Sequence, residues 1–322
     1  MSKFGVITGS MGNVGDRYCL NGYKNDIPLD KMLEGFSKIK HLSGVEISQG
    51  EIGNVAEKDI KDMFNTYGLT ISAVGIDLTS DPKWKFGSIT SKHANLRADA
   101  VEQLKRTMDF GMAIGTDLLN VWLGQDGFDY PLQVDYTKQW AYALDVLREC
   151  ADYNPNIRLA LEPKPREPRN RSFIDSTTTA LLLVMDVGRK NVGVTLDVGH
   201  ILQEGKNMAQ SIAYAHIHGK LFNLHINDNY STWDDDMIVG SVHFVEFIEM
   251  FYTLRKIGYD NWCAVDIFPY REESLRALEE SILNMHKFNE LVDIIGAAEL
   301  DKCVSGDDVT HTIKLIREKA FR

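Results

Sequence analysis

Val192-Gly-Val-Thr-Leu-Asp197 is an apolar run of strand type that ends on a carboxylate, and three further segments in the second half of the chain have the same form. They are residues 157–162, 221–225 and 262–266, which end on Glu162, His225 and Asp266. Successive ends lie roughly 30 to 40 residues apart, and one strand–helix–strand unit takes about 30 or more residues. Because the carboxyl ends of parallel strands meet at one rim of a barrel, we expect these four side chains to converge there.

Strand-like and helix-like patterns alternate along the whole chain. The expected strands are residues 4–8, 44–48, 69–75, 118–122, 157–162, 192–197, 221–226 and 262–267. The expected helices are residues 29–41, 55–67, 94–114, 134–153, 176–187, 208–218, 242–257 and 273–291. Regular alternation implies a parallel sheet. Eight such pairs predict an α/β fold, a (β/α)8 TIM barrel that forms a catalytic domain over residues 1–291.

A C-terminal helical extension is expected over residues 292–322, with helical spacing at 309–316. The structural alternative to a barrel is a doubly wound open sheet, which alternates in the same way. Its glycine fingerprint is only weakly matched by Gly9-Ser-Met-Gly12-Asn-Val-Gly15, and no helix is expected directly after that stretch. Chemistry at several strand ends therefore favours the closed barrel.

The composition limits the class of partner. A formal net charge of −11 over 322 residues argues against a nucleic-acid partner, which needs a basic face. No apolar run approaches the roughly 18–20 residues of a membrane span, and the N-terminus lacks the apolar core of a signal peptide. The four cysteines are far apart and form no CxxC pair, which indicates a reducing compartment. We expect a cytoplasmic protein.

The four strand-end side chains suggest a metal site. Three carboxylates and one imidazole form a hard, mostly oxygen ligand set, for which Mn²⁺ is the first expectation and Mg²⁺ or Co²⁺ the alternatives. Any one of them alone is better explained as a residue that caps the following helix or pairs with an arginine. Four in phase on four strands are not explained in that way.

A second cation is expected beside the first. His200 lies three residues after Asp197, and Asp234 and Asp236 would lie on one face of an extended loop. Two-metal sites hold their ions about 4 Å apart. The alternative for the segment Trp233-Asp-Asp-Asp236 is an ordinary solvated acidic turn.

Together these segments resemble the xylose isomerase-like TIM barrels. The resemblance covers about residues 69–270 and depends most on Glu162-Pro-Lys-Pro-Arg-Glu-Pro-Arg169, followed by Asp197-Val-Gly-His200 and the later acidic turn. Xylose isomerase itself has Glu and Asp at the strand-six and strand-seven positions. This chain has Asp197 and His225 there, a combination more similar to L-rhamnose isomerase and the ketose 3-epimerases.

The resemblance implies a role for each ligand set. Glu162, Asp197, His225 and Asp266 would hold the ion that binds sugar hydroxyls, and His200, Asp234 and Asp236 the catalytic ion with its water. Lys164 corresponds to a lysine that polarises the substrate carbonyl, and an ammonium group near a developing alkoxide stabilises that charge. The alternative for Lys164 is a surface lysine in a proline-rich loop.

The chain departs from the family pattern after the second strand. The ring-opening His-x-x-Asp of xylose isomerase corresponds here to Ser48-Gln-Gly-Glu51, so that only Glu51 remains as an acid or base. Simple xylose isomerisation is therefore not expected. Further candidates for substrate contact are three aromatic platforms and one imidazole: Trp122, Trp84, Trp233 and His243.

The sequence thus predicts a divalent-metal-dependent sugar isomerase or epimerase that acts beside a carbonyl, with Lys164, His200, Glu162 and Glu51 as catalytic residues. One alternative implied by the family is the large subunit of a C-glycoside deglycosidase, a lyase that acts on a 3-keto sugar glycoside. The non-enzyme alternative is a binding barrel. A homo-oligomer is expected, or a hetero-oligomer with a small subunit if the chain is a lyase.

Overall fold

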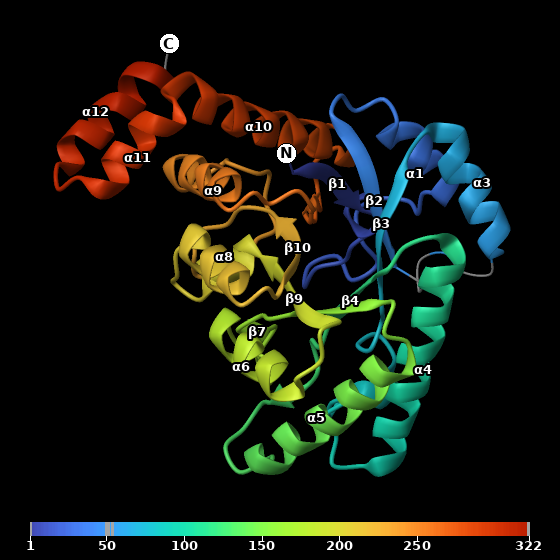
Figure 1. The fold of residues 1–322 in the computed structure, drawn as a ribbon. Coiled ribbons are helices and arrows are strands. Elements are labelled where there is room, and N and C mark those ends of the chain that lie inside the picture. The colour runs from blue at the N-terminus through green and yellow to red at the C-terminus, as the bar shows by residue number, and fades with distance from the viewer. Residues whose placement is uncertain (1, 49–51, 53–54, 321–322) are drawn as a thin grey trace.

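Eight parallel strands close into a barrel in the computed structural model, which describes residues 2–48, 52 and 55–320 (Figure 1). Their order around the barrel is β1-β11-β10-β9-β6-β4-β3-β2. Pairing of β1 with β11 closes the sheet, with Val6 opposite Val265. The predicted (β/α)8 barrel is confirmed, and the open doubly wound sheet is wrong because a doubly wound sheet keeps two free edges.

The barrel strands and their covering helices lie close to the positions expected from the sequence. The strands are β1 (Lys3–Ile7), β2 (Leu42–Ser48), β3 (Thr70–Gly75), β4 (Leu118–Trp122), β6 (Arg158–Glu162), β9 (Val192–Asp197), β10 (Leu221–Ile226) and β11 (Trp262–Val265). The helices are α1 (Leu29–Phe36), α3 (Glu57–Tyr67), α4 (Ala94–Ile114), α5 (Tyr136–Tyr153), α6 (Thr177–Val187), α8 (Met208–Ile217), α9 (Phe244–Lys256) and α10 (Ser274–Ile295).

Burial on both faces explains the apolar character of the strands. Helices cover the outside of a parallel barrel and side chains fill its inside, so its strands are near-continuous apolar runs. In β9 all six positions are buried. On the outside, α9 and α10 pack through aromatic rings: the Phe247 and Phe288 centroids lie 5.3 Å apart in a stacked arrangement.

The carboxyl rim carries short elements that the sequence analysis did not anticipate. Helix α7 (Val198–Gln203) follows β9 directly. A small antiparallel sheet joins β5 (Gly127–Phe128), β8 (Asn170–Ser172) and β7 (Arg166–Glu167) in that order. The short 3-10 helices η1 (Thr8–Met11) and η2 (Pro82–Trp84) complete the rim loops. These pieces fix the loops that surround the barrel mouth.

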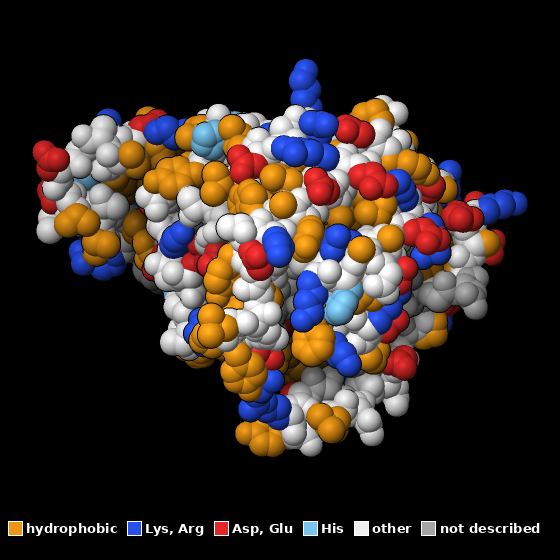
Figure 2. All heavy atoms as spheres, turned by 90° about the horizontal axis from the view of Figure 1, so that it is seen from below, with side chains coloured by type: hydrophobic (Ala, Val, Ile, Leu, Met, Phe, Trp, Pro, Cys, Tyr) orange, Lys and Arg blue, Asp and Glu red, His pale blue; other side chains and the backbone are white. Residues whose placement is uncertain are grey.

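The C-terminal extension is helical, with α11 (Ala297–Ser305) and α12 (Val309–Ala320). It forms a lobe beside the barrel, seen at the upper left of Figure 1 and again at the left of Figure 2. The boundary expected between residues 291 and 292 falls inside α10, because its buried stripe continues through Val292 and Ile295 until Gly296, with φ of 96°, ends the helix. The division into two domains stays a prediction.

Two surface properties bear on partners. Among the described residues, no helix is both long enough and apolar enough to cross a membrane. On the face shown in Figure 2, basic and acidic side chains are interspersed with hydrophobic ones. The described residues of that face therefore offer no continuous basic surface of the kind that nucleic acids bind.

Candidate active site and metal centre

A cavity of about 380 Å³ at the carboxyl rim collects most of the side chains singled out in the sequence. At this cavity the structure forms two metal-competent groups, each with ligand atoms that all lie within 4.8 Å of one another. The first contains Glu162, Asp197, His225 and Asp266, and the second contains Asp197, His200 and Asp234. All but Asp266 are buried.

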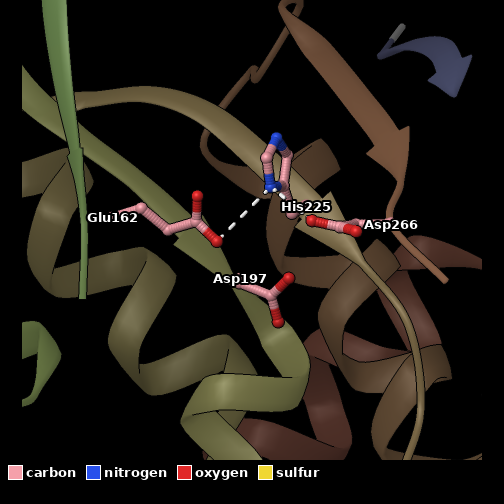
Figure 3. A group of neighbouring side chains, drawn as sticks. All are labelled: Glu162, Asp197, His225 and Asp266. Carbon is pink, nitrogen blue, oxygen red and sulfur yellow. Dashed lines mark ion pairs between the residues drawn. The ribbon is translucent and has the colours of Figure 1, made fainter. Parts of the chain in front are cut away.

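The first group is built by consecutive strand ends. Glu162 and Asp197 end β6 and β9, His225 lies opposite Asp197 in the register of β10 with β9, and Asp266 follows β11. The His225 Nδ1 lies 3.0 Å from Asp266 Oδ2 and 3.5 Å from Glu162 Oε1. Figure 3 shows the four side chains directed from their separate strands toward one space. The structure therefore brings together the four residues that the strand-end pattern predicted would converge.

In each histidine, one ring nitrogen points away from the cluster and donates to an acceptor. The other ring nitrogen, called here the inner nitrogen, faces the carboxylates. His225 Nε2 donates to Glu46 Oε2 at 3.0 Å, and His200 Nδ1 donates to the Pro163 carbonyl at 2.9 Å. A carbonyl and a carboxylate can only accept, so these contacts fix the ring orientation and leave His225 Nδ1 and His200 Nε2 as the inward atoms. His200 Nε2 lies 3.1 Å from Asp234 Oδ2.

The carboxylates are oriented by buried amides. Asn120 on β4 donates to Glu162 Oε2 at 2.7 Å. Asn227 donates to both oxygens of Asp197, at 3.0 and 2.9 Å. A Cβ on Gly199 would lie 1.8 Å from Asn227 Oδ1, so the glycine of the Asp-Val-Gly-His motif is needed for this close approach. Asp197 also caps α7 through the His200 backbone N–H at 3.0 Å.

Protons balance the negative charge of the site. Burial raises the pKa of Asp197 to about 7, opposed by His200 and reinforced by Asp234 and Asp266. Burial alone would lower the pKa of His200, but Asp197 and Asp234 outweigh it and raise the pKa to about 9. Burial acts to raise the pKa of Glu162, yet His225, His200 and the Asn120 amide hold that pKa at about 2. Burial acts to lower the pKa of His225 as well, but Glu46 and Glu162 outweigh it and raise that pKa well above its usual value. Protonated His200 and His225 thus supply the positive charge that the buried carboxylates require.

The donor set fits a divalent cation. Within the described part of the chain, the buried Asp266 Oδ1 has no hydrogen-bond partner, and the buried His225 Nδ1 makes no directed hydrogen bond although it lies 3.0 Å from Asp266 Oδ2. Leaving buried polar atoms unpaired costs free energy, so their presence in a cluster points to a missing ligand. Imidazole nitrogen and carboxylate oxygen together suit Mn²⁺, Mg²⁺ or Co²⁺. A bound ion would replace the histidine protons.

The second group differs from the expected set. Asp236 lines the same cavity but lies outside the group of Asp197, His200 and Asp234. The expectation assumed an extended loop, whereas Asp236 has φ of 48° in the left-handed region, so the alternation that would place its side chain on the same face as that of Asp234 does not apply. Burial and the neighbouring Asp234 raise the pKa of Asp236 well above its usual value.

Lys164 is a buried member of the site, with 7% exposure, and is no surface lysine. Its Nζ lies 2.8 Å from Asp234 Oδ2 and 2.7 Å from Glu167 Oε2, and it sits over the Trp122 ring at 5.3 Å. Burial alone would lower the pKa of Lys164, but Asp234, Asp236 and Glu167 outweigh it and raise the pKa well above its usual value. Lys164 therefore remains a cation and serves as a donor, not as a base.

Of the other residues predicted to contact the substrate, only some lie at the cavity. Trp122 lines the cavity. Trp84 is 1% exposed within the core and lies apart from the lining residues. Trp233 packs under the Arg166 guanidinium at 5.5 Å, and His243 Nδ1 pairs with Asp228 at 2.7 Å, so neither joins the lining. Glu51 lies outside the described residues.

Three residues missed by the sequence analysis hold the ligands, and besides Asn227 two of them lie inside strands. Glu46 is 5% exposed in the middle of β2, between Val45 and Ile47, and Asn120 occupies a similar place in β4. A charged residue inside an apolar strand indicates a functional position, and this pattern could have identified Glu46 from the sequence. A neutral amide in a strand gives no comparable signal.

The fold and the site define a class. The chain belongs to the xylose isomerase-like TIM barrel family, whose family model matches residues 36–288. Among individual proteins, it is similar to the xylose isomerase of Thermus thermophilus, at 29% identity over 219 residues, which are 66% of this chain and 57% of the relative. The chain therefore spans less than two thirds of the length of this curated relative.

Solved structures share the fold over almost their whole length. The structure of an L-ribulose 3-epimerase matches with a TM-score of 0.75 and 17% identity, covering 95% of this chain and 99% of that one. A 3-keto-D-glucoside 4-epimerase from E. coli matches with a TM-score of 0.67 and 19% identity, covering 89% and 99%. At these identities the likeness establishes the barrel alone.

Proposed function

We propose that this chain is a divalent-metal-dependent carbohydrate enzyme, an aldose–ketose isomerase or an epimerase that acts beside a sugar carbonyl. The observation that carries the proposal is the paired orientation of His225 and His200, whose inner nitrogens face buried carboxylates in one cavity. The names of the similar proteins, which include a xylose isomerase and two epimerases, support the same class. A cytoplasmic location and a homo-oligomer stay predictions.

The proposed resident cation is Mn²⁺, with Mg²⁺ or Co²⁺ as alternatives. Glu162, Asp197, His225 and Asp266 would hold it, and His200 and Asp234 with Asp197 are the residues for a second ion. When bound, such an ion polarises a sugar carbonyl and lowers the pKa of the adjacent hydroxyls.

The chain's own side chains supply the remaining chemistry. The Lys164 ammonium keeps its proton and would donate to the substrate oxygen on which negative charge develops. The Glu162 carboxylate lines the cavity and would accept a proton from the carbon beside the carbonyl. The half-buried Trp122 would pack on the C–H face of the sugar and exclude water from this step.

Exchange of sugar hydrogens tests the proposal. Mn²⁺-loaded protein is incubated with a panel of ketoses and aldoses in D₂O, and the products are followed by NMR. We expect deuterium incorporation beside the carbonyl, or an isomer or epimer, for at least one sugar. The absence of both across the panel would contradict the proposal. Release of an aglycone from a 3-keto glycoside without isomer formation would instead support the lyase alternative.

A further inference from the structure

A second and larger cavity, of about 1210 Å³, lies beside the candidate active site on the same rim. Trp122 and Glu167 line both cavities, so the two spaces meet at these residues. Small-molecule sites commonly measure about 300–1,000 Å³, and the first cavity of about 380 Å³ falls near the lower limit. The second cavity is therefore additional room beyond the site of reaction.

The walls of the second cavity are fixed by buried polar contacts. Asp126 is fully buried and accepts from the backbone N–H and hydroxyl groups of Ser88, at 2.9 and 2.5 Å, and of Thr90, at 2.8 and 2.6 Å. These bonds attach the loop that carries Phe86 to the loop after β4. A rigid wall of this kind is typical of a preformed small-molecule site.

The opposite wall is held by the small rim sheet. Phe128 pairs with Arg171 between β5 and β8, and its ring packs edge-on against Tyr136 at 5.3 Å. At the junction, a Cβ on Gly124 would lie 2.5 Å from the Trp122 ring, so the glycine allows the ring to lie between the two cavities. The aromatic faces at this junction are thus held in place before any ligand arrives.

The chemistry of the lining differs between the two cavities. Among the described residues, both groups that could hold a metal ion belong to the candidate active site. The second cavity is lined by the aromatic rings of Phe86 and Phe128, by Tyr142, on whose ring the Arg97 guanidinium stacks at 3.8 Å, and by polar side chains such as Lys92 and Gln133. Aromatic faces pack on the C–H face of a pyranose ring, and polar side chains bind its hydroxyl groups. This lining is suited to a sugar ring that does not itself react.

We propose that the second cavity binds a further sugar ring linked to the reacting one, so that the substrate is a glycosylated sugar of at least two rings. The inference rests on the proposed function and names its substrate class. Trp122 and the Lys164–Glu167 ion pair at 2.7 Å form the junction between the rings. Binding energy from the distal ring then orients the reacting ring beside Lys164.

Binding measurements on the full, Mn²⁺-loaded chain test this inference. The probes are D-fructose and its glucosylated forms turanose, maltulose and isomaltulose. In these disaccharides the glucose ring is attached to O3, O4 and O6 of fructose, respectively. Titration calorimetry should find at least one disaccharide bound about tenfold more tightly than fructose, a difference of about 1.4 kcal/mol. Phe128→Ala should remove this advantage and leave fructose binding unchanged.

A second variant of the cavity lining and a control variant test whether the effect is specific to the second cavity. Phe86→Ser changes a side chain that is 59% exposed, so it should weaken disaccharide binding without affecting folding. Tyr214→Ala, on α8 and away from the rim, is the matched control and should change neither affinity.

Three results would overturn the inference. Fructose could bind as tightly as every disaccharide, the Phe128→Ala variant could weaken fructose and disaccharide equally, or sedimentation could show that Phe128→Ala dissociates an oligomer, which would make the cavity a subunit interface. Failure of the proposed function has a different signature, because the disaccharide would still bind but no sugar would exchange hydrogen in D₂O.

Discussion

The two halves of the barrel contribute differently to the site. In the second half, β6 and β9 end on the ligands Glu162 and Asp197, His225 is the last residue but one of β10, and Asp266 follows β11. In the first half, β2 and β4 supply Glu46 and Asn120, which form hydrogen bonds with His225 and Glu162 and so orient these two ligands. The second half therefore provides the ligands, and the first half orients two of them, whereas Asp197 and His200 are oriented by Asn227 and the Pro163 carbonyl of the second half.

This division depends on closure of the barrel. Strands β2 and β10 are not neighbours in the strand order, so the contact from Glu46 to His225 crosses the barrel interior. An open sheet would separate these strands. Outer partners of metal ligands typically affect metal affinity or activity by about 10–100-fold, less than the loss of a ligand. The predictions below use this difference between ligand and support.

The largest effect is expected from a ligand. Glu162→Gln removes a carboxylate of the proposed metal set and the proposed proton acceptor, so kcat should fall by about 10³-fold or more, as for groups that act on developing charge. The exposed Glu149→Gln on α5 is the matched control and should keep full activity. Turnover of Glu162→Gln within a fewfold of the unaltered enzyme would remove Glu162 from the mechanism.

Lys164→Met tests the cation separately from the metal. Methionine fills a similar volume without charge, so kcat should fall by about 10²–10³-fold, while Mn²⁺ affinity at the first group, which does not include the Lys164 partner Asp234, changes little. Steady-state kinetics and calorimetry check the two parts. A variant that raised KM and left kcat intact would indicate that Lys164 binds the substrate without stabilising developing charge.

A support residue should have a smaller effect than a ligand. Glu46→Gln exchanges the acceptor of His225 Nε2 for a neutral amide and should weaken Mn²⁺ binding by about 10–100-fold. The ¹⁵N chemical shifts of the His225 ring report its tautomer and should change in the metal-free variant. Glu57→Gln, exposed on α3, is the control. Unaltered metal affinity together with an unaltered tautomer would contradict the role of Glu46.

The smallest effect on activity is expected at His243. Its Nδ1 pairs with the buried Asp228, so His243→Gln should lower the free energy of unfolding by about 1–3 kcal/mol. Turnover and metal affinity should remain unchanged, as checked by thermal unfolding and kinetics. A fall in kcat comparable to that of Lys164→Met would restore His243 as a substrate contact.

The difference between ligand and support also explains what the sequence could predict. A charged residue that ends an apolar run is visible in one dimension, and Glu162, Asp197, His225 and Asp266 were found in this way. The partner of a ligand is visible only when strands distant in the chain are brought together, and Glu46 was therefore missed.

Local backbone conformation caused the remaining differences. Spacing could not indicate the left-handed backbone of Asp236, a residue that lies outside the group of Asp197, His200 and Asp234. Nor does an aromatic residue in a loop indicate its depth, and Trp84 proved to belong to the core. The fold was more predictable than the site because eight repeats of the same alternation are redundant, whereas each site contact depends on one conformation.

The most direct test of the account is a Mn²⁺ titration of the metal-free protein, with bound and free ion distinguished by electron paramagnetic resonance. The unaltered chain should take up at least one Mn²⁺ per chain, and Asp266→Asn should lose that binding while its circular dichroism spectrum is retained. Absence of Mn²⁺ uptake by the unaltered chain, with Mg²⁺ and Co²⁺ also failing to bind in calorimetry, would contradict the central claim that these strand ends converge to hold a cation.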